Sequence, residues 1–260
     1  MGKAWMIASG KGGTGKTTLT ASLAIVLAKR ACKVCVVDAS IGLKGADLLL
    51  GMENRVVYDM FDVMEEICTL DAALIAHAEY PELQLLSTSQ TESADSFKAR
   101  RFEHIIKKLK KRFDVVMIDC PAGADALHVD IAQAVDCCIL AITPDDAAIR
   151  AAEKLSSILF EKSRTEMYLA VNAVDEKLIH DGTMLEPAQI SVMIDAPLLG
   201  EIPFSIQVYC ALLQHKTPLE AGEKIYSAAV TQMAARMQSE DVPFKTYRVR
   251  RKKWFQHAEG

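Results

Sequence analysis

A glycine-rich loop close to the N-terminus constrains the fold of this chain more than any other stretch. It reads GKGGTGKTT over residues 10–18 and matches the pattern G-x-x-x-x-G-K-T in full. An apolar run at 5–8 precedes it, and a helical pattern from Thr17 to Lys29 follows it. Glycines let backbone N–H groups converge on one anion, and a helix start favours negative charge, so a phosphate-binding loop is expected. The predicted phosphate-contacting residues are Gly10, Lys11, Gly12, Gly13, Thr14, Gly15, Lys16, Thr17 and Thr18.

Two side chains at the end of the loop carry specific chemistry. Lys16 supplies a positive charge for the β- and γ-phosphates of a nucleotide, and Thr17 supplies a hydroxyl ligand for Mg²⁺. The alternative is a structural glycine turn with an incidental lysine. The apolar run before the loop and the helical pattern after it argue against that alternative.

A second lysine, Lys11, stands at the start of the loop, where an ordinary phosphate-binding loop needs no cation. Within one subunit it adds little to what Lys16 already supplies. If two subunits meet face to face across their nucleotides, Lys11 of one can reach the phosphates of the other, as an arginine finger does. The alternative is a solvated loop lysine.

Composition narrows the class of protein. The chain has 260 residues, of which 50% are hydrophobic and 25% are charged, which suits one sizeable α/β core. The net charge of −4 argues against nucleic-acid binding by bulk charge, while a local basic patch stays open. Seven cysteines without a disulfide framework indicate a reducing cytosol. No signal peptide and no uncharged apolar stretch of about 18–20 residues is visible, so we expect a soluble or peripheral protein.

Strand-like and helical segments alternate after the loop. Apolar runs without polar alternation predict strands that are buried on both faces. They lie at 33–38, 83–86, 113–119, 137–142, 167–172 and 197–203, and helical patterns lie near 59–64, 94–112, 145–160, 205–214 and 219–238. This order predicts an α/β fold with a doubly wound, mostly parallel sheet and helices on both faces. We expect residues 1–240 to form a single domain, with a basic and aromatic tail at 241–260.

Two aspartates, Asp38 and Asp119, close predicted strands. Because parallel strands place their carboxyl ends at one edge of the sheet, both should lie near the glycine-rich loop. A carboxylate at Asp119 can hold Mg²⁺ opposite Thr17, so the predicted metal-binding residues are Thr17, Asp38 and Asp119. The alternative for either aspartate is a loop-starting residue or a helix cap.

Five segments resemble one family. The signature K-G-G-x-G-K-T-T stands at 11–18, and DASIGLKGAD at 38–47 looks like the switch I segment D-x-D-x-G-L-R-N-x-D. NRVVYD at 54–59, LSTSQT at 86–91 and DCPAG at 119–123 look like the family's R-V-V-Y-D, L-P-A-S-Q-T and D-S-P-A-G. On these residues the chain resembles the deviant Walker A ATPases of the MinD/ParA family, and their MinD branch most, over about 1–240.

The resemblance implies a function. It implies an ATP- and Mg²⁺-dependent homodimer with the nucleotides sandwiched between subunits, in which Lys11 reaches across. It implies that Asn172, ending its strand, recognises adenine with backbone near Pro203. It also implies an ATPase at the division site, cytoplasmic and peripheral at the inner face of the membrane, with a MinC-like inhibitor and a MinE-like stimulator as partners. The implied catalytic residues are Lys11, Lys16, Asp38, Ser40 and Asp119.

The chain departs from the family at two points in the site. Ser40 stands where the family has an aspartate that positions the attacking water, and a hydroxyl cannot accept a proton as a carboxylate does. We therefore expect slow hydrolysis, and a regulatory ATP-binding protein that scarcely hydrolyses is an alternative. Residues 202–205, IPFS, lack the acidic pair that often follows this proline, which leaves the detail of the adenine pocket open.

Two basic stretches leave further alternatives. The tail at 244–257 carries basic and aromatic residues that suit an anionic membrane surface, and a solvated tail is the alternative. The basic helix expected at 94–112 is a solvated face, a partner surface or a DNA-binding surface as in ParA-type partition ATPases. DNA binding is the less favoured reading. A metal-cluster carrier would need paired cysteines, and Cys120 has no evident mate.

Overall fold

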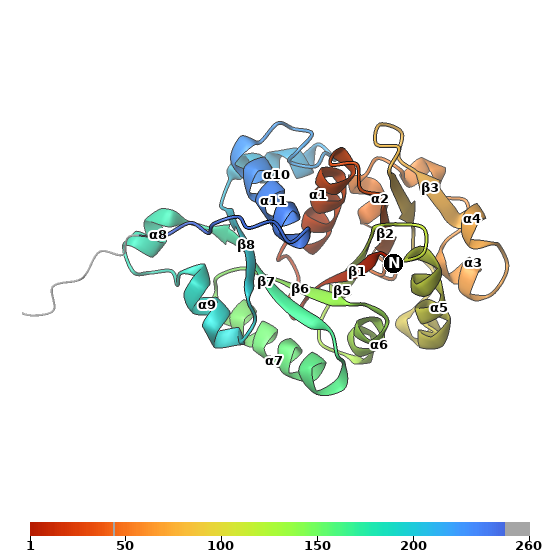
Figure 1. The fold of residues 1–260 in the computed structure, drawn as a ribbon, viewed down its shortest axis with the longest axis horizontal. Helices are drawn as coiled ribbons and strands as arrows, with labels where there is room; N and C mark the ends of the chain where they lie inside the picture. The colour runs from red at the N-terminus through yellow and green to blue at the C-terminus, as the bar shows by residue number, and fades with distance from the viewer. Residues whose placement is uncertain (44, 248–260) are drawn as a thin grey trace, which may run out of the picture.

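The structure, a computed structural model, describes residues 1–43 and 45–247. Its described strands form one sheet in the order β3-β4-β2-β5-β1-β6-β7-β8 (Figure 1). All neighbours are parallel except β3 and β4, which are antiparallel. The strands are β1 (Lys3–Ser9), β2 (Val34–Asp38), β3 (Leu74–Ala76), β4 (Leu83–Leu86), β5 (Val115–Ala122), β6 (Cys137–Ile142), β7 (Glu166–Val174) and β8 (Leu198–Pro203).

Helices cover both faces of this sheet, so the predicted doubly wound α/β fold is confirmed. Those in the described part of the chain are α1 (Lys16–Lys29), α2 (Ala46–Leu49), α3 (Met60–Met64), α4 (Leu70–Ala73), α5 (Ala99–Leu109), α6 (Ala126–Ala134), α7 (Asp146–Lys162), α8 (Glu176–His180), α9 (Pro187–Ile194), α10 (Ile206–Leu213) and α11 (Lys224–Met237), with short 3₁₀ turns η1 (Glu53–Arg55) and η2 (Ala94–Ser96).

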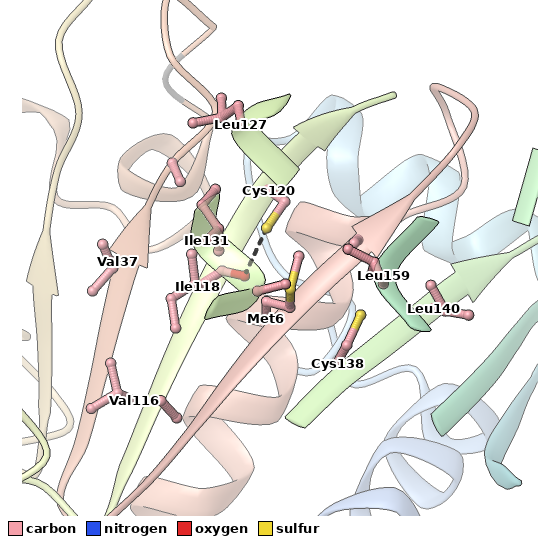
Figure 2. Close-up of a cluster of buried hydrophobic side chains, with 14 of the residues drawn as sticks. Met6, Val37, Val116, Ile118, Cys120, Leu127, Ile131, Cys138, Leu140 and Leu159 are labelled. Atoms are coloured by element: carbon pink, nitrogen blue, oxygen red, sulfur yellow. Dashed lines mark hydrogen bonds between the residues drawn. The ribbon is translucent and has the colours of Figure 1, made fainter. Parts of the chain in front are cut away.

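The core has two layers because successive strand residues point to opposite faces. In β1, Met6 packs in the layer beneath α5, α6 and α7, and Ile7 packs in the layer beneath α1 and α11. Figure 2 shows the first layer, where Cys120 and Cys138 fill apolar positions as small hydrophobic side chains. The strands at the centre of the sheet are buried on both faces, which is why their sequences lack polar alternation.

Three predicted helices have different bounds in the structure. The segment expected at 94–112 begins its α-helix at Ala99, because η2 and an extended Phe97 precede it. The helix expected from 219 begins at Lys224, where the Glu223 carboxylate accepts from the backbone N–H of Tyr226 and caps it. The helix expected over 205–214 runs from Ile206 to Leu213.

Candidate functional site

The glycine-rich loop joins β1 to α1, as predicted. Gly15 ends the loop with a φ of 88°, in the left-handed region that an L side chain rarely adopts. A Cβ at this position would also lie 2.5 Å from Nδ2 of Asn172. Gly10 is constrained by packing instead, since a Cβ there would lie 2.3 Å from the carbonyl oxygen of Ala151 in α7. The loop can therefore close tightly only with glycine at both positions.

Lys16, the first residue of α1, turns its side chain back into the loop. Its Nζ donates to Oγ of Ser9 at 3.2 Å, and Oγ1 of Thr14 donates to the same atom at 3.0 Å. Burial lowers the pKa of Lys16, and the charge of Asp119 opposes this shift. Sequence reasoning missed Ser9, and its place as the last residue of the strand before the loop is the signal that could have identified it.

Asp38 and Asp119 lie side by side at the carboxyl edge of the sheet, where β2 and β5 pair them in register. Oδ2 of Asp119 accepts from Oγ1 of Thr17 at 2.7 Å, and Oδ1 accepts from Oγ1 of Thr20 at 3.3 Å. The two aspartates and Thr17 therefore come together as predicted. Thr20 was missed, although it stands four residues after Lys16 and so lies on the same face of α1.

Ser40 stands between the two carboxylates. Its backbone N–H donates to Oδ1 of Asp38 at 2.8 Å, and its hydroxyl lies 3.4 Å from Oδ2 of Asp119. The backbone N–H of Ala46 donates to the other oxygen of Asp38 at 3.2 Å. The segment from Asp38 to Ala46 is thus held beside Asp119 through the carboxylate of Asp38, and the serine hydroxyl can donate where a carboxylate could only accept.

The electrostatics of this edge favour a cation. Burial raises the pKa of Asp38 to about 7, and the negative charge of Asp119 adds to the rise. Burial also raises the pKa of Asp119 to about 6, although the hydroxyl of Thr17 and the charge of Lys16 act in the opposite direction. Two buried carboxylates beside a threonine hydroxyl are hard oxygen donors of the kind that Mg²⁺ prefers. The residues present therefore fit a Mg²⁺ ion next to bound phosphates.

Lys11 lies at the surface of the loop, beside the start of α7. Its Nζ is 3.0 Å from Oδ1 of Asp145, and about half of each side chain is exposed. Asp145 also caps α7 by accepting from the backbone N–H of Ala148. The hydrogen bond from the hydroxyl of Thr143 and, to a smaller extent, the bond from Lys11 lower the pKa of Asp145 to about 2. A flexible, solvated ion pair of this kind is weak, so Lys11 can leave Asp145 for a stronger anion. Sequence reasoning placed Asp145 only at the start of the helix expected near 145–160.

Asn172 and Pro203, the predicted adenine contacts, lie on neighbouring strands. Asn172 does not end its strand as expected, because β7 continues to Val174, which pairs with Pro203 of β8. Nδ2 of Asn172 donates to the carbonyl of Thr14 at 3.0 Å, so this side chain abuts the phosphate-binding loop. The Asn172 side chain thus borders the loop, and Pro203 lies at the end of the neighbouring strand.

Five of the eight basic residues from Lys98 to Arg112, in α5 and the segments that flank it, are paired with acidic residues of this chain. These basic residues form ion pairs with acidic residues of neighbouring segments and with one acidic residue of α5 itself. The pairs are Lys98 with Glu65, Arg101 with Glu66, Lys107 with Glu103, Lys110 with Asp136 and Arg112 with Asp71. The structure therefore favours the solvated and locally paired reading over an open basic surface.

The structure bears on two further expectations, which are the role of Cys120 in a metal cluster and the role of the tail at a membrane. Cys120 is fully buried in the core layer of Figure 2, which makes it unsuitable as a ligand shared between two subunits. Most of the tail, from Arg248 onward, lies outside the described residues. Its first part packs on the domain, where the hydroxyl of Tyr247 donates to Glu201 of β8 at 2.7 Å. Among the described residues, no helix is long and apolar enough to span a membrane.

Comparison with known proteins gives one consistent family. A family profile described as "ParA: NUBPL iron-transfer P-loop NTPase" matches residues 1–238. The septum site-determining protein MinD of a Synechocystis species is 33% identical over 246 residues, which cover 94% of this chain and 92% of that protein. The MinD chain of a MinC:MinD cell division complex from Aquifex aeolicus has a TM-score of 0.86 at 29% identity, covering 94% of this chain and 99% of that one.

A third relative has the same fold at lower identity. The septum site-determining protein MinD of Pyrococcus horikoshii, solved as a complex with Mg-ADP, has a TM-score of 0.80 at 24% identity. The match covers 91% of this chain and 96% of that chain. The architecture that holds the loop and the two aspartates is thus shared with proteins from distant organisms.

Proposed function

The chain belongs to the MinD family of P-loop ATPases, and we propose that it acts as an ATP-dependent dimerising switch in the placement of the division site. Its relatives and its fold identify the chain as a MinD-like ATPase. The observation that carries the proposal is the assembled site: Lys16 inside the loop, and Thr17 bonded to Asp119 beside Asp38. The cofactors we propose are ATP and Mg²⁺.

Each residue has a proposed role. Backbone N–H groups of the loop and Lys16 hold the phosphates, while Thr17, Asp38 and Asp119 hold Mg²⁺, directly or through water. When bound there, Mg²⁺ would supply positive charge next to the phosphates, and these three residues would hold it. Asn172 and backbone near Pro203 border the adenine. Lys11 leaves Asp145 and reaches the nucleotide of a second subunit.

The partners are proposed from the family. A MinC-like inhibitor is supported by the MinC:MinD complex of the Aquifex relative. A MinE-like stimulator and an anionic membrane surface follow from the sequence resemblance alone. Because the first tail residues pack on β8 through Tyr247, the proposed membrane segment begins after that residue. ParA-type DNA binding is not favoured, since five of the eight basic residues from Lys98 to Arg112 are paired within the chain.

Two measurements test the proposal. The purified chain should hydrolyse ATP in a Mg²⁺-dependent reaction, and with ATP it should sediment with vesicles of anionic lipid but not with neutral ones. The matched control is a chain that ends at Tyr247, which should keep the ATPase activity and lose the sedimentation. Sedimentation that survives this truncation would place the membrane contact elsewhere, and an absence of hydrolysis and of ATP binding would contradict the whole proposal.

Ser40→Asp should raise ATP turnover at least tenfold, since a positioned general base contributes about 10²–10⁴-fold. The same change should destabilise the protein without Mg²⁺, because it adds a third carboxylate within reach of Asp119. Steady-state ATPase assays and thermal unfolding with and without Mg²⁺ measure both effects. Ser40→Ala is the matched control and should not raise turnover. If Ser40→Asp leaves turnover unchanged, the serine does not limit hydrolysis.

Binding of Mg²⁺ and ATP should release protons from the aspartate pair near pH 6.5. Asp38, with a pKa near 7, is partly protonated there, and a cation beside it lowers that pKa and expels the proton. Calorimetric titrations in buffers of different ionisation enthalpy measure the number released. Asp38→Asn removes the group while the proton release of the nucleotide itself stays the same. The release of the wild type should exceed that of the variant at pH 6.5 and equal it at pH 8.5; equal release at both pH values would contradict the prediction.

A further inference from the structure

A stretch without charged side chains follows β8 on the described surface. From Phe204 to His215 the sequence is FSIQVYCALLQH, without an acidic residue, a lysine or an arginine. We define the α10 face as the exposed apolar side chains of this stretch together with a neighbour at the start of α11. These side chains are between 55% and 64% exposed, and they are Phe204, Ile206, Tyr209, Leu213 and Ile225.

The residues that α10 contributes to this face lie on one side of the helix. Within α10, Ala211 is buried and Val208 packs against the core, so one side of the helix is anchored. Ile206, Tyr209 and Leu213 follow at intervals of three and four residues, which places them on the opposite side. The sequence therefore specifies a helix with apolar residues on both sides, and only one side is covered within this chain.

The α10 face begins next to the nucleotide site. The hydroxyl of Tyr226 in α11 donates to Oγ of Ser22 in α1 at 3.0 Å and lies 3.4 Å from the carbonyl oxygen of Thr18. Glu223, which caps α11, lies 3.4 Å from the hydroxyl of Ser205 at the start of α10. The start of α1, which carries Lys16 and Thr17, is thus connected through α11 to Phe204 and Ile206 (Figure 1 shows α1, α11 and α10 together).

The position of the α10 face and the chemistry of its side chains favour a second copy of this chain as the partner. It adjoins the site across which Lys11 is proposed to reach a second subunit, so a second copy would meet it in the same approach. Aromatic and aliphatic side chains without charge are typical of the central part of an interface between identical subunits. An anionic membrane would require an excess of basic residues, whereas Lys216 and Lys224 are balanced here by Glu220 and Glu223.

We propose that the α10 face is part of the surface that contacts a second copy of this chain in the ATP-bound dimer. The inference rests on the proposed function, because it assigns a surface to the dimer proposed there. Phe204 and Ser205, which follow Pro203, bring no charge into this contact, and Phe204 extends its apolar area.

A native thiol reports on this contact without any substitution. Cys210 is exposed on α10, whereas Cys32 and Cys68 are half-buried elsewhere and the remaining cysteines are buried. Cys32 and Cys68 therefore serve as internal references for thiol reactivity. Alkylation of Cys210 by N-ethylmaleimide, followed by mass spectrometry, should be at least about tenfold slower with ATP and Mg²⁺ than with ADP and Mg²⁺. The rates for Cys32 and Cys68 should be the same in both conditions. In Lys11→Ala, which should stay monomeric, ATP should not protect Cys210.

Tyr209→Glu tests the same surface by size-exclusion chromatography with light scattering. The variant should bind ATP as the wild type does and should weaken the ATP-bound dimer at least about thirtyfold, because the carboxylate would be desolvated in the contact. Phe160→Glu is the matched control and should dimerise normally. Phe160 is 79% exposed, and along α7 it lies roughly 22 Å from Asp145, at the end of the helix away from the site.

The outcomes separate the two claims. A wild type that forms no ATP-dependent dimer contradicts the proposed function, and the assignment of the α10 face fails with it. If the dimer forms while Cys210 reacts as fast as in the ADP state and Tyr209→Glu dimerises normally, only the assignment of the α10 face is overturned. Protection of Cys210 by anionic vesicles in Lys11→Ala would also overturn it, in favour of a lipid contact.

Discussion

Lys16→Ala should weaken ATP binding about 100-fold and abolish turnover. The side chain is held inside the loop by Ser9, so it is already positioned for phosphate oxygens. Hydrogen bonds to charged groups contribute roughly 1.5–3 kcal/mol each, and two such bonds to the β- and γ-phosphates amount to about 3 kcal/mol or more. Each 1.4 kcal/mol corresponds to about tenfold in affinity. Titration with a fluorescent ATP analogue measures the loss.

The matched control for this prediction is Lys29→Ala at the other end of α1. Lys29 lies two turns or more beyond the site and is exposed, so its removal should leave ATP affinity unchanged. Lys16→Ala should remain folded, because burial already disfavours the charge of this ammonium group. Equal ATP affinity for Lys16→Ala and the wild type would show that the loop is not the phosphate site.

Asp119→Asn should separate activity from stability. We expect turnover to fall about 100-fold or more, because the carboxylate that faces Thr17 would no longer hold Mg²⁺. Stability should change in the opposite direction. Asp119 has a pKa of about 6 in the folded protein, which exceeds the value of about 3.9 for an unfolded chain. The folded state therefore prefers the protonated acid, and its stability falls as the pH rises from about 4 through 6.

Asparagine cannot ionise, so this loss of stability with pH is removed in the variant. Without nucleotide and Mg²⁺, Asp119→Asn should be at least as stable as the wild type at pH 7.5, and its advantage should shrink towards pH 4. Denaturant unfolding at several pH values measures the difference. Asp95→Asn, at an exposed position, serves as the control and should change neither turnover nor stability. A variant that keeps full turnover would remove Asp119 from the metal site.

The parts of the site that could be predicted from sequence are those fixed by local chain order. The loop between β1 and α1 and the aspartates that end β2 or lie near the end of β5 follow from strand–loop–helix order and from the shared edge of parallel strands. The second lysine of the loop pattern pointed to Lys11, and the resemblance then supplied Asn172 and Ser40 as positions of interest. The structure places all of them around one loop.

What could not be predicted depends on contacts between distant segments. Ser9 and Thr20 are ordinary polar residues in sequence, and only the packing of β1, α1 and β5 turns them toward Lys16 and Asp119. The pairing of Lys11 with Asp145 joins residues that are 134 positions apart. The end of β7 was misplaced because Asn172 looked like a polar stop, whereas its amide bonds to the loop and the strand continues to Val174.

The same limit applies to α5 and α10. The charges of α5 and its flanking segments looked like a continuous basic surface until their acidic partners, which follow α3 or lie on α4, were placed beside them. The apolar periodicity of α10 predicted a helix, but the sequence alone could not show which side is covered. Short-range patterns indicate elements, and partners across the fold decide what each surface can do.

Lys11 is proposed to make this site one half of a site shared by two subunits. Size-exclusion chromatography with light scattering, run with ATP, with ADP and without nucleotide, tests it most directly on the wild type and on Lys11→Ala. A dimer should form only for the wild type with ATP, while Lys11→Ala should bind ATP and stay monomeric. A dimer that forms without nucleotide, or one that Lys11→Ala forms with ATP as readily as the wild type, would contradict it.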